Sequence, residues 1–227
     1  MMLKINNTVK SRYPKPNTTL LGFFLFFCLF FIPKGISQKV IEKSWKGTAF
    51  EVIEILSDEV FNIEIIAGNF SEIKLQSKIA GENFESMNIG ASEKGKILTL
   101  KPSYRPYFIP QNDKLAAHKV ISIELQLYIP EWMTVFISSK LASLEATGNF
   151  KELDVNLRDG HCILKEFSGN AMLNTHFGNI TVYAKPEVSG VGVSKKGTVF
   201  NKLSGKAMYT LIAESVNGNI SLFHTPE

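Results

Sequence analysis

The chain is poor in cysteine, and its first 37 residues contain no acidic residue. Of its two cysteines, Cys28 lies in that first segment and Cys162 lies far downstream. Residues 38–227 therefore hold one thiol and cannot form an intrachain disulfide. About 190 residues are enough to build a sizeable apolar core. We expect the core and backbone hydrogen bonds, and not covalent crosslinks, to hold the fold together.

The formal charge of +4 comes from the start of the chain. Residues 1–37 carry five of the 25 basic residues and none of the 21 acidic ones, so the remainder has 20 basic and 21 acidic residues. From residue 38 onward the net charge is −1. A nearly neutral chain with scattered lysines is not typical of a nucleic-acid-binding protein. We expect no nucleic-acid partner.

The first segment has the pattern of an export signal. A basic stretch precedes residues 20–32, thirteen residues without charge, and small residues, Gly35 and Ser37, follow at the positions three and one before Gln38. This arrangement predicts a signal peptide over residues 1–37 with cleavage before Gln38. The protein would then be exported to the periplasm, the cell surface or the medium.

Two other fates of this segment compete with cleavage. Thirteen residues reach about 20 Å of a roughly 30 Å hydrocarbon core, too short for a full span. An uncleaved N-terminal anchor remains the alternative, because the phenylalanine-rich run is very apolar, and it is the only membrane contact we expect. A lipoprotein signal needs small residues before its cysteine, whereas Phe26 and Phe27 precede Cys28, so lipidation is not expected.

Helical periodicity is almost absent after residue 39, and alternation of apolar and polar residues takes its place. Residues 60–65, 120–129 and 153–157 show the period of two that is typical of strands with one buried face. The sequence therefore predicts an all-β protein.

Glycine suggests how these strands are arranged. Five Gly-Asn dipeptides separate them, and both residues tolerate the tight turns that strands need. Glycines recur about every 20 residues after residue 148, and residues 167–173 and 177–182 resemble residues 203–209 and 217–222. This pattern favours a β-solenoid with about 20 residues per coil. An antiparallel sandwich with regular hairpins is the alternative.

The solenoid prediction assigns roles along the chain. Residues 131–227 would form the repeats, and residues 38–130 would form an N-terminal β region that caps the stack within one continuous domain. A stack of this kind needs a cover because its end strands are open edges. The expected inward row is Leu144, Ala146, Leu153, Val155, Leu157, Cys162, Leu164, Phe167, Leu173, Thr175, Phe177, Ile180, Val182, Ala184, Leu211, Ala213, Ile220 and Leu222.

One loop interrupts the N-terminal region. Residues 102–110 contain three prolines, which do not fit a central strand. The loop also carries Tyr104, Arg105, Tyr107 and Phe108, which we take as the candidate ligand or partner surface. The alternative is that these rings fold back and cap the apolar end of the stack.

Residues 128–139 carry a family resemblance. Their pattern of an aliphatic residue, proline, four residues and valine (Ile129, Pro130, Val135), with the Gly-Asn turns that follow, resembles the bacterial secreted "putative adhesin" β-solenoid families. The likeness covers roughly residues 50–223, and it departs in the proline-rich loop and at Ser139-Lys140, where relatives often have glycine. It implies a right-handed stacked-coil fold and an envelope or surface role. It brings no catalytic residues.

Motifs for catalysis or cofactors are missing. The four histidines do not show metal-ligand spacing. His161 and Cys162 are neighbours on a predicted strand, so their side chains point to opposite faces, and we expect Cys162 to be buried and inert. The glycines of residues 190–198 lack the Gly-Lys-Ser/Thr ending and the helix of a phosphate-binding loop. We expect no cofactor and no metal.

One polar cluster provides an enzymatic alternative. Asp154, Arg158, Asp159 and His161 would lie on or near one outward face, and some polysaccharide-cleaving enzymes use stacked β-coils. The matching positions one coil later are Asn174 and His176, without an acid, so a solvated face is the simpler interpretation.

These observations predict a non-enzymatic, exported β-solenoid of adhesin type with a binding or structural role. Its partners would be envelope glycans, surface proteins or its own copies. Two alternatives stay open: a carbohydrate-active β-helix enzyme using the polar cluster, and a membrane-anchored envelope sensor or scaffold that retains residues 20–32.

Overall fold

A computed structural model describes residues 38–81, 83–108 and 121–226. The expected signal segment, residues 1–37, lies outside the described residues, as do Ile109 and Pro110 of the proline-rich loop. No helix within the described ranges is long and apolar enough to cross a membrane.

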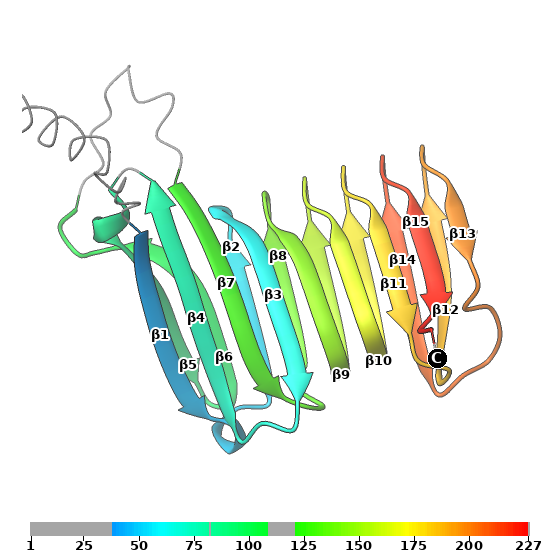
Figure 1. The fold of residues 1–227 in the computed structure, drawn as a ribbon, viewed down its shortest axis with the longest axis horizontal. Helices are drawn as coiled ribbons and strands as arrows, with labels where there is room; N and C mark the ends of the chain where they lie inside the picture. The colour runs from blue at the N-terminus through cyan, green and yellow to red at the C-terminus, as the bar shows by residue number, and fades with distance from the viewer. Residues whose placement is uncertain (1–37, 82, 109–120, 227) are drawn as a thin grey trace, which may run out of the picture. The chain divides into compact units, whose positions relative to one another are not determined.

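The described residues form fifteen strands and two short 3₁₀ helices (Figure 1). The helices are η1 (Gly47–Ala49) and η2 (Phe84–Ser86). The strands are β1 (Gln38–Lys46), β2 (Val52–Ser57), β3 (Val60–Gly68), β4 (Glu72–Gly81), β5 (Met87–Lys94), β6 (Ile97–Tyr104), β7 (Ile121–Pro130), β8 (Thr134–Ser139), β9 (Ser143–Leu157), β10 (Cys162–Thr175), β11 (Ile180–Ala184), β12 (Val188–Ser194), β13 (Val199–Asn201), β14 (Tyr209–Ser215) and β15 (Ile220–His224).

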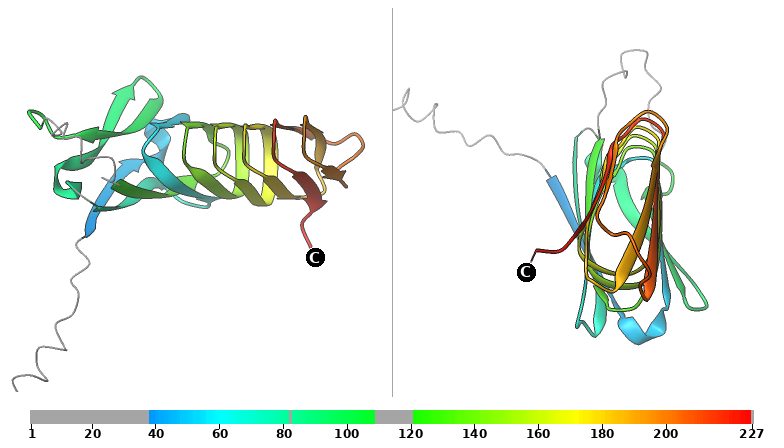
Figure 2. Two further views of the ribbon diagram at one scale, coloured as in Figure 1. Left: turned by 90° about the horizontal axis from the view of Figure 1, so that it is seen from above. Right: turned by 90° about the vertical axis from the view of Figure 1, so that its right-hand side faces the viewer.

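The strands belong to one mixed sheet that is folded into two facing layers (Figures 1 and 2). One layer has the order β1-β4-β7-β3-β9-β10-β11-β15-β13. The other runs β5-β6-β2-β8-β9-β10-β14-β12 through its pairings. The long strands β9 and β10 take part in both layers, because their first halves pair with β3 and β11 and their second halves pair with β8 and β14.

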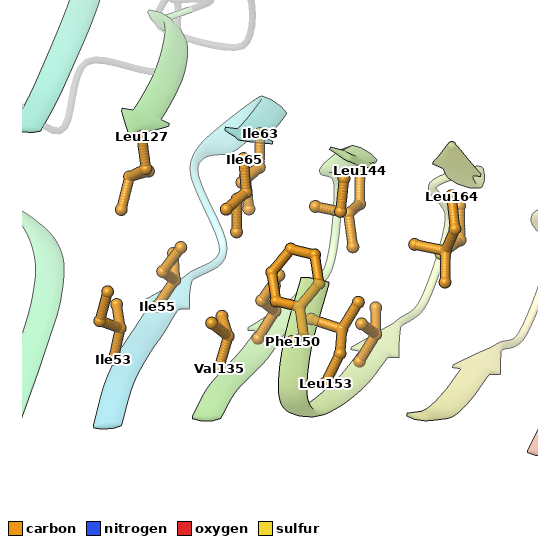
Figure 3. Packing of buried hydrophobic residues seen from close by; sticks show 14 of the residues in the cluster. Ile53, Ile55, Ile63, Ile65, Leu127, Val135, Leu144, Phe150, Leu153 and Leu164 are labelled. Carbon is orange, nitrogen blue, oxygen red and sulfur yellow. The ribbon is translucent and has the colours of Figure 1, made fainter. Parts of the chain in front are cut away.

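Apolar side chains fill the space between the layers. Ile63, Ile65 and Leu144 from one layer face Ile53 and Val135 from the other (Figure 3). The buried residues form one continuous cluster along the described part of the chain. Each strand contributes every second side chain, which is why the sequence alternates with a period of two.

The all-β prediction is confirmed, but the predicted regular solenoid is wrong. The sheet is mixed and not closed: β1 pairs with β4, β4 with β7, and β5 with β6, each in antiparallel fashion. The order of the strands in the sheet also differs from their order in the sequence. Strand β3 lies between β7 and β9, and β13 lies beyond β15, which follows it in the sequence. Parallel partners are 18 residues apart between β10 and β11 but 40 apart between β11 and β15, so no constant coil of about 20 residues exists.

The N-terminal region was expected to cap the end of a solenoid stack within one continuous domain, and the cap is wrong along with the solenoid. Strands β2 and β3 pair in parallel with β8 and β9, so residues 38–130 continue the same sheet. At the outer end of this region the edge of β5 is covered by side chains of β1. Lys39 Nζ and Lys43 Nζ each donate to a backbone carbonyl of β5, those of Met87 and Ile89, both at 2.6 Å.

The opposite end of the sheet is closed by a loop. Leu203 is buried there, between the edge strands β12 and β13 and the core. The N–H of Gly190 donates to the carbonyl of Leu203 at 2.7 Å, and Asn201 Nδ2 donates to the carbonyl of Gly190 at 2.7 Å. This loop satisfies edge groups of β12 that no strand covers.

The predicted inward row is correct except at Phe177. All its other members are buried, whereas Phe177 is 55% exposed. It lies in the turn between β10 and β11, where the Thr175 hydroxyl donates to the carbonyl of Gly178 at 2.7 Å. This bond closes the turn around residues 176 and 177, so the alternation of the strand stops before Phe177.

Candidate functional site

A column of glycines forms one turn edge of the parallel strands. A Cβ placed on Gly160, Gly178, Gly218 or Gly197 would lie 1.6 to 2.2 Å from a carbonyl oxygen of the adjacent turn. For Gly178 the distance would be 1.7 Å to the oxygen of Gly160. Only glycine permits this close approach of backbones. The column therefore explains why glycines recur at residues 160, 178, 197 and 218.

A second column consists of hydroxyl groups that close the same turns from inside. Ser215 Oγ accepts from the N–H of Gly218 at 2.8 Å and donates to the carbonyl of Gly178 at 3.2 Å. The N–H three residues further on also donates to the hydroxyls of Ser57, Ser139 and Ser194. The Thr175 hydroxyl instead donates to the carbonyl of Gly178. The pattern Ser/Thr-x-x-Gly at residues 175, 194 and 215 is its sequence signature. The two columns make the parallel strands a fixed frame for outward side chains.

His161 belongs to a third, polar column on the same edge. Its Nδ1 accepts from the N–H of Asn179 at 3.0 Å, and Asn179 Oδ1 accepts from the N–H of Asn219 at 2.8 Å. Asn219 Oδ1 in turn accepts from the N–H of Thr198 at 2.9 Å. This nitrogen of His161 is therefore occupied by a structural hydrogen bond, like the asparagines of the Gly-Asn turns.

Among the described residues, no hydrogen bond or ion pair joins His161 to Asp154, Arg158 or Asp159. Asp154 Oδ1 accepts from Asn156 Nδ2 at 2.9 Å on the outer face of β9. Arg158 binds Asp159 through Nε and Nη2 at 2.9 and 2.7 Å, and this hydrogen bond raises the pKa of Arg158. A groove of about 540 Å³ is lined by Arg158 but by none of the other three.

Cys162 lies within the core, as expected. It is fully buried, and burial raises the pKa of its thiol to about 12. A thiol in this environment stays protonated and out of reach of solutes. Across the described ranges, no group of three or more His, Cys, Asp or Glu side chains is placed to hold a metal ion.

The predicted aromatic surface is exposed at the end of β6. Tyr107 is fully exposed, and the rings of Tyr104 and Phe108 stack with centroids 5.2 Å apart. These rings do not cover the core. Strand β6 runs through Pro102, although the sequence suggested that this segment is not a central strand. Proline fits at this position because pairing with β2 stops at Leu100, so Pro102 has a partner strand on one side only.

The sequence did not indicate a second groove. It lies at the turn edge opposite the glycine column. It has a volume of about 350 Å³ and is lined by η1, by the turn after β3 and by the turn between β7 and β8. Phe70 and Trp132 both line it, and both are partly exposed. Its polar lining includes Glu51, Glu131 and Lys151. The hydrogen bond from Lys96 keeps the pKa of Glu51 low, so Glu51 is ionised.

Trp132 occupies this groove in an unusual backbone conformation. Its φ is 62°, in the left-handed region that glycine and asparagine adopt most easily. For a residue with a Cβ this conformation costs about 1–2 kcal/mol. The side chain is nevertheless 47% exposed, and its ring lies 5.9 Å from that of Tyr209. The indole is therefore held at the surface by a strained turn.

The turn of Trp132 is fixed on both sides. The N–H of Trp132 donates to the carbonyl of Asn149 at 3.1 Å, and Asn149 Nδ2 donates to Glu131 Oε1 at 2.9 Å. Lys185 Nζ binds Asn149 Oδ1 at 2.8 Å. Next to Asn149, the backbone at Gly148 approaches so closely that a Cβ would lie 2.1 Å from the carbonyl oxygen of Ala67. The groove thus stands on a rigid part of the sheet.

The only signal for Trp132 in the sequence was its position. A tryptophan follows Pro130 and Glu131 between two strands, where a turn residue is expected. This stretch also carries the family resemblance, which implies a fold and no site residue.

Comparison with known proteins supports the fold. No family model matches the chain, and no curated protein is similar enough in sequence to count as a match. A solved structure from Clostridium sporogenes ATCC 15579, a "putative cell adhesion protein", aligns over 83% of this chain and all of its own, with a TM-score of 0.60 and 19% identity. The two proteins share their fold.

Two further solved structures are more distant. A "putative adhesin" from Parabacteroides merdae ATCC 43184 covers 81% of each chain, with a TM-score of 0.38 and 10% identity. Another from Bacteroides fragilis NCTC 9343 covers 82% of this chain and 98% of its own, with a TM-score of 0.35 and 14% identity. Of these three likenesses, only the fold shared with the Clostridium sporogenes protein bears on the expected adhesin-like family, and the β-solenoid in that expectation is not confirmed.

Proposed function

We propose that this protein is a non-catalytic, adhesin-type binding protein of the cell envelope or surface. The single observation that carries the proposal is the half-exposed Trp132 in a left-handed turn beside a groove of about 350 Å³. Strain of this kind persists where a function benefits from it. The volume falls within the range of small-ligand sites. The shared fold with a protein named for cell adhesion supports the same role, and the signal-like residues 1–37 support export.

The groove suits a neutral sugar ring. A sugar has an apolar face of C–H groups and a rim of hydroxyls, and the indole and Phe70 provide apolar surfaces at its walls. Glu51, Glu131 and Lys151 provide acceptors and donors around them. Acids and base are mixed here, so the lining does not select a strongly charged ligand.

The chain contains two tryptophans, which gives a direct test. In a Trp45→Phe variant Trp132 is the only indole, and in a Trp132→Phe variant Trp45 is the only one. Soluble β-glucan, xylan, mannan and galactan would be titrated into both while indole emission is recorded. We expect at least one polysaccharide to shift the emission of Trp132 in a saturable way and to leave that of Trp45 unchanged.

A paired variant separates the groove from the aromatic loop. Tyr104→Ala with Tyr107→Ala should bind the same polysaccharide as tightly as the wild type, because those rings lie outside the groove lining. Release of new reducing ends during the incubation would contradict a non-catalytic role. No response from Trp132 to any of the four polysaccharides would refute the sugar site.

A further inference from the structure

A run of 26 residues, Val188–Ala213, contains four lysines and no acidic residue. The lysines are Lys195, Lys196, Lys202 and Lys206. Since residues 38–227 as a whole carry a net charge of −1, this run of +4 leaves −5 on the remainder. Basic charge is thus concentrated in one run of residues 38–227, which together are almost neutral.

The run is gathered at one end of the sheet. It comprises the last strand of each layer, β12 and β13, the turn between them, the loop that contains Leu203, and most of β14 (Figures 1 and 2). All four lysines are exposed. Within the part of the chain that the structure describes, no carboxylate oxygen lies within 4.0 Å of their Nζ atoms. Lys202 instead lies 5.4 Å from the centre of the Phe200 ring.

Exposed apolar side chains stand among these lysines. Met208 is 78% exposed, and Phe200 and Val199 are about half exposed. We call the four lysines together with Val199, Phe200 and Met208 the basic end. Lysines alone would be explained as protection of open strand edges against pairing. That role gives no reason for an exposed methionine and phenylalanine at the same place.

We infer that the basic end binds an anionic phospholipid surface. Such a surface offers phosphate charges to the lysines and an apolar interior to Met208, Phe200 and Val199, which is how interfacial protein segments bind. A second copy of this end would bring four lysines against four lysines, so like charge opposes it. A soluble anionic polysaccharide would pair with the lysines but leave the apolar side chains in water.

The expected strength follows from the lysines. Each lysine near an anionic leaflet raises the partition coefficient about fivefold, so neutralising two of them lowers it about 25-fold. High salt screens the attraction and should release the protein. The binding is therefore weak, reversible and dependent on lipid charge.

The test is sedimentation of the purified protein with vesicles. Vesicles of phosphatidylglycerol and phosphatidylcholine in equal parts should carry the protein down, and pure phosphatidylcholine vesicles or 0.5 M NaCl should not. Lys195→Gln with Lys196→Gln should weaken partitioning about 25-fold. The matched control, Lys78→Gln with Lys94→Gln, removes the same charge from exposed positions on β4 and β5 and should have little effect. Met208→Ser should weaken binding without changing the charge.

Three results would overturn the inference. They are no binding to the anionic vesicles, equal weakening by the control pair, and binding to a soluble polyuronate in place of vesicles. None of them bears on the groove of Trp132, because no residue of the basic end lines that groove and the groove is tested with neutral polysaccharides. Either proposal, the sugar site at the groove or lipid binding at the basic end, can therefore fail without the other.

Discussion

The N-terminal region, residues 38–130, and the C-terminal region, residues 131–226, build one core by different means. In the first, antiparallel pairs such as β4–β7 and β5–β6 set the register through backbone hydrogen bonds along their length. In the second, parallel strands stack turn upon turn, so each turn must fit the one beside it. The glycine and hydroxyl columns lie almost wholly in the second region. Stacked parallel turns, and not strands in general, impose the small residues.

The two ends of the sheet are also closed by different means. Lysine side chains of β1 cover the edge of β5 at one end, and the buried Leu203 with its loop closes the other. Burial and the nearby Arg105 lower the pKa of Lys39, in keeping with an ammonium drawn against the backbone. Lysine side chains thus close the antiparallel end, whereas a buried leucine and the hydrogen bonds of its loop close the parallel end.

Gly178→Ala in the C-terminal region should cause the largest loss of stability among the variants that compare the two regions. The new Cβ would lie 1.7 Å from the Gly160 carbonyl oxygen, and a backbone group cannot rotate away. We expect a loss of more than about 3 kcal/mol in the free energy of unfolding, measured by urea denaturation.

The matched change in the N-terminal region is Gly95→Ala. Gly95 has φ of 59° in the hairpin between β5 and β6, and nothing lies within 4 Å of its added Cβ. Only the left-handed conformation is penalised, so the loss should be about 1 kcal/mol. Equal losses at the two glycines would mean that turn stacking does not distinguish the regions.

The two ends should respond with smaller, unequal losses. Leu203→Ala removes a buried side chain that closes the core, and we expect a loss of about 2–3 kcal/mol. Lys43→Met keeps the apolar stem but removes the 2.6 Å bond to the carbonyl of Ile89, with a loss of about 1 kcal/mol. Urea denaturation of both variants measures the two losses. A larger loss for Lys43→Met than for Leu203→Ala would contradict the proposed closure of the two ends.

Much of the fold could be predicted from the sequence. The period of two identified the strands and almost the whole inward row, because one face of each strand is buried. The resemblance between residues 177–182 and 217–222 was also correct, since Ile180 pairs directly with Ile220. These features depend on neighbours in the chain or on repeated chemistry, both of which leave a pattern.

The order of strands in space could not be predicted. β15 stacks on β11 while the earlier β13 lies outside it, and β2 finds its parallel partner β8 about 80 residues later. Residues 203–209 resemble residues 167–173, yet Leu203 closes the end of the core, and it is Leu211 that pairs with Ala171. Local pattern does not record which strand inserts between which others, so an even glycine spacing suggested a regular coil.

The candidate site was the least predictable part. The aromatic loop was visible because prolines and rings cluster in sequence, whereas the groove joins Phe70 and Trp132 from turns that are 62 residues apart. The strain at Trp132 shows only in its backbone angle. Neither the separation of the two turns in the sequence nor the strained backbone of Trp132 produces a recognisable sequence motif.

The most direct test of the binding role is Trp132→Gly, with stability and polysaccharide binding measured on the same protein. Glycine accepts the left-handed turn without strain, which offsets the lost contact with Tyr209. We predict a change in the free energy of unfolding below about 1 kcal/mol, together with at least a tenfold loss of affinity. A folded Trp132→Gly protein that binds polysaccharide as well as the wild type would contradict the account.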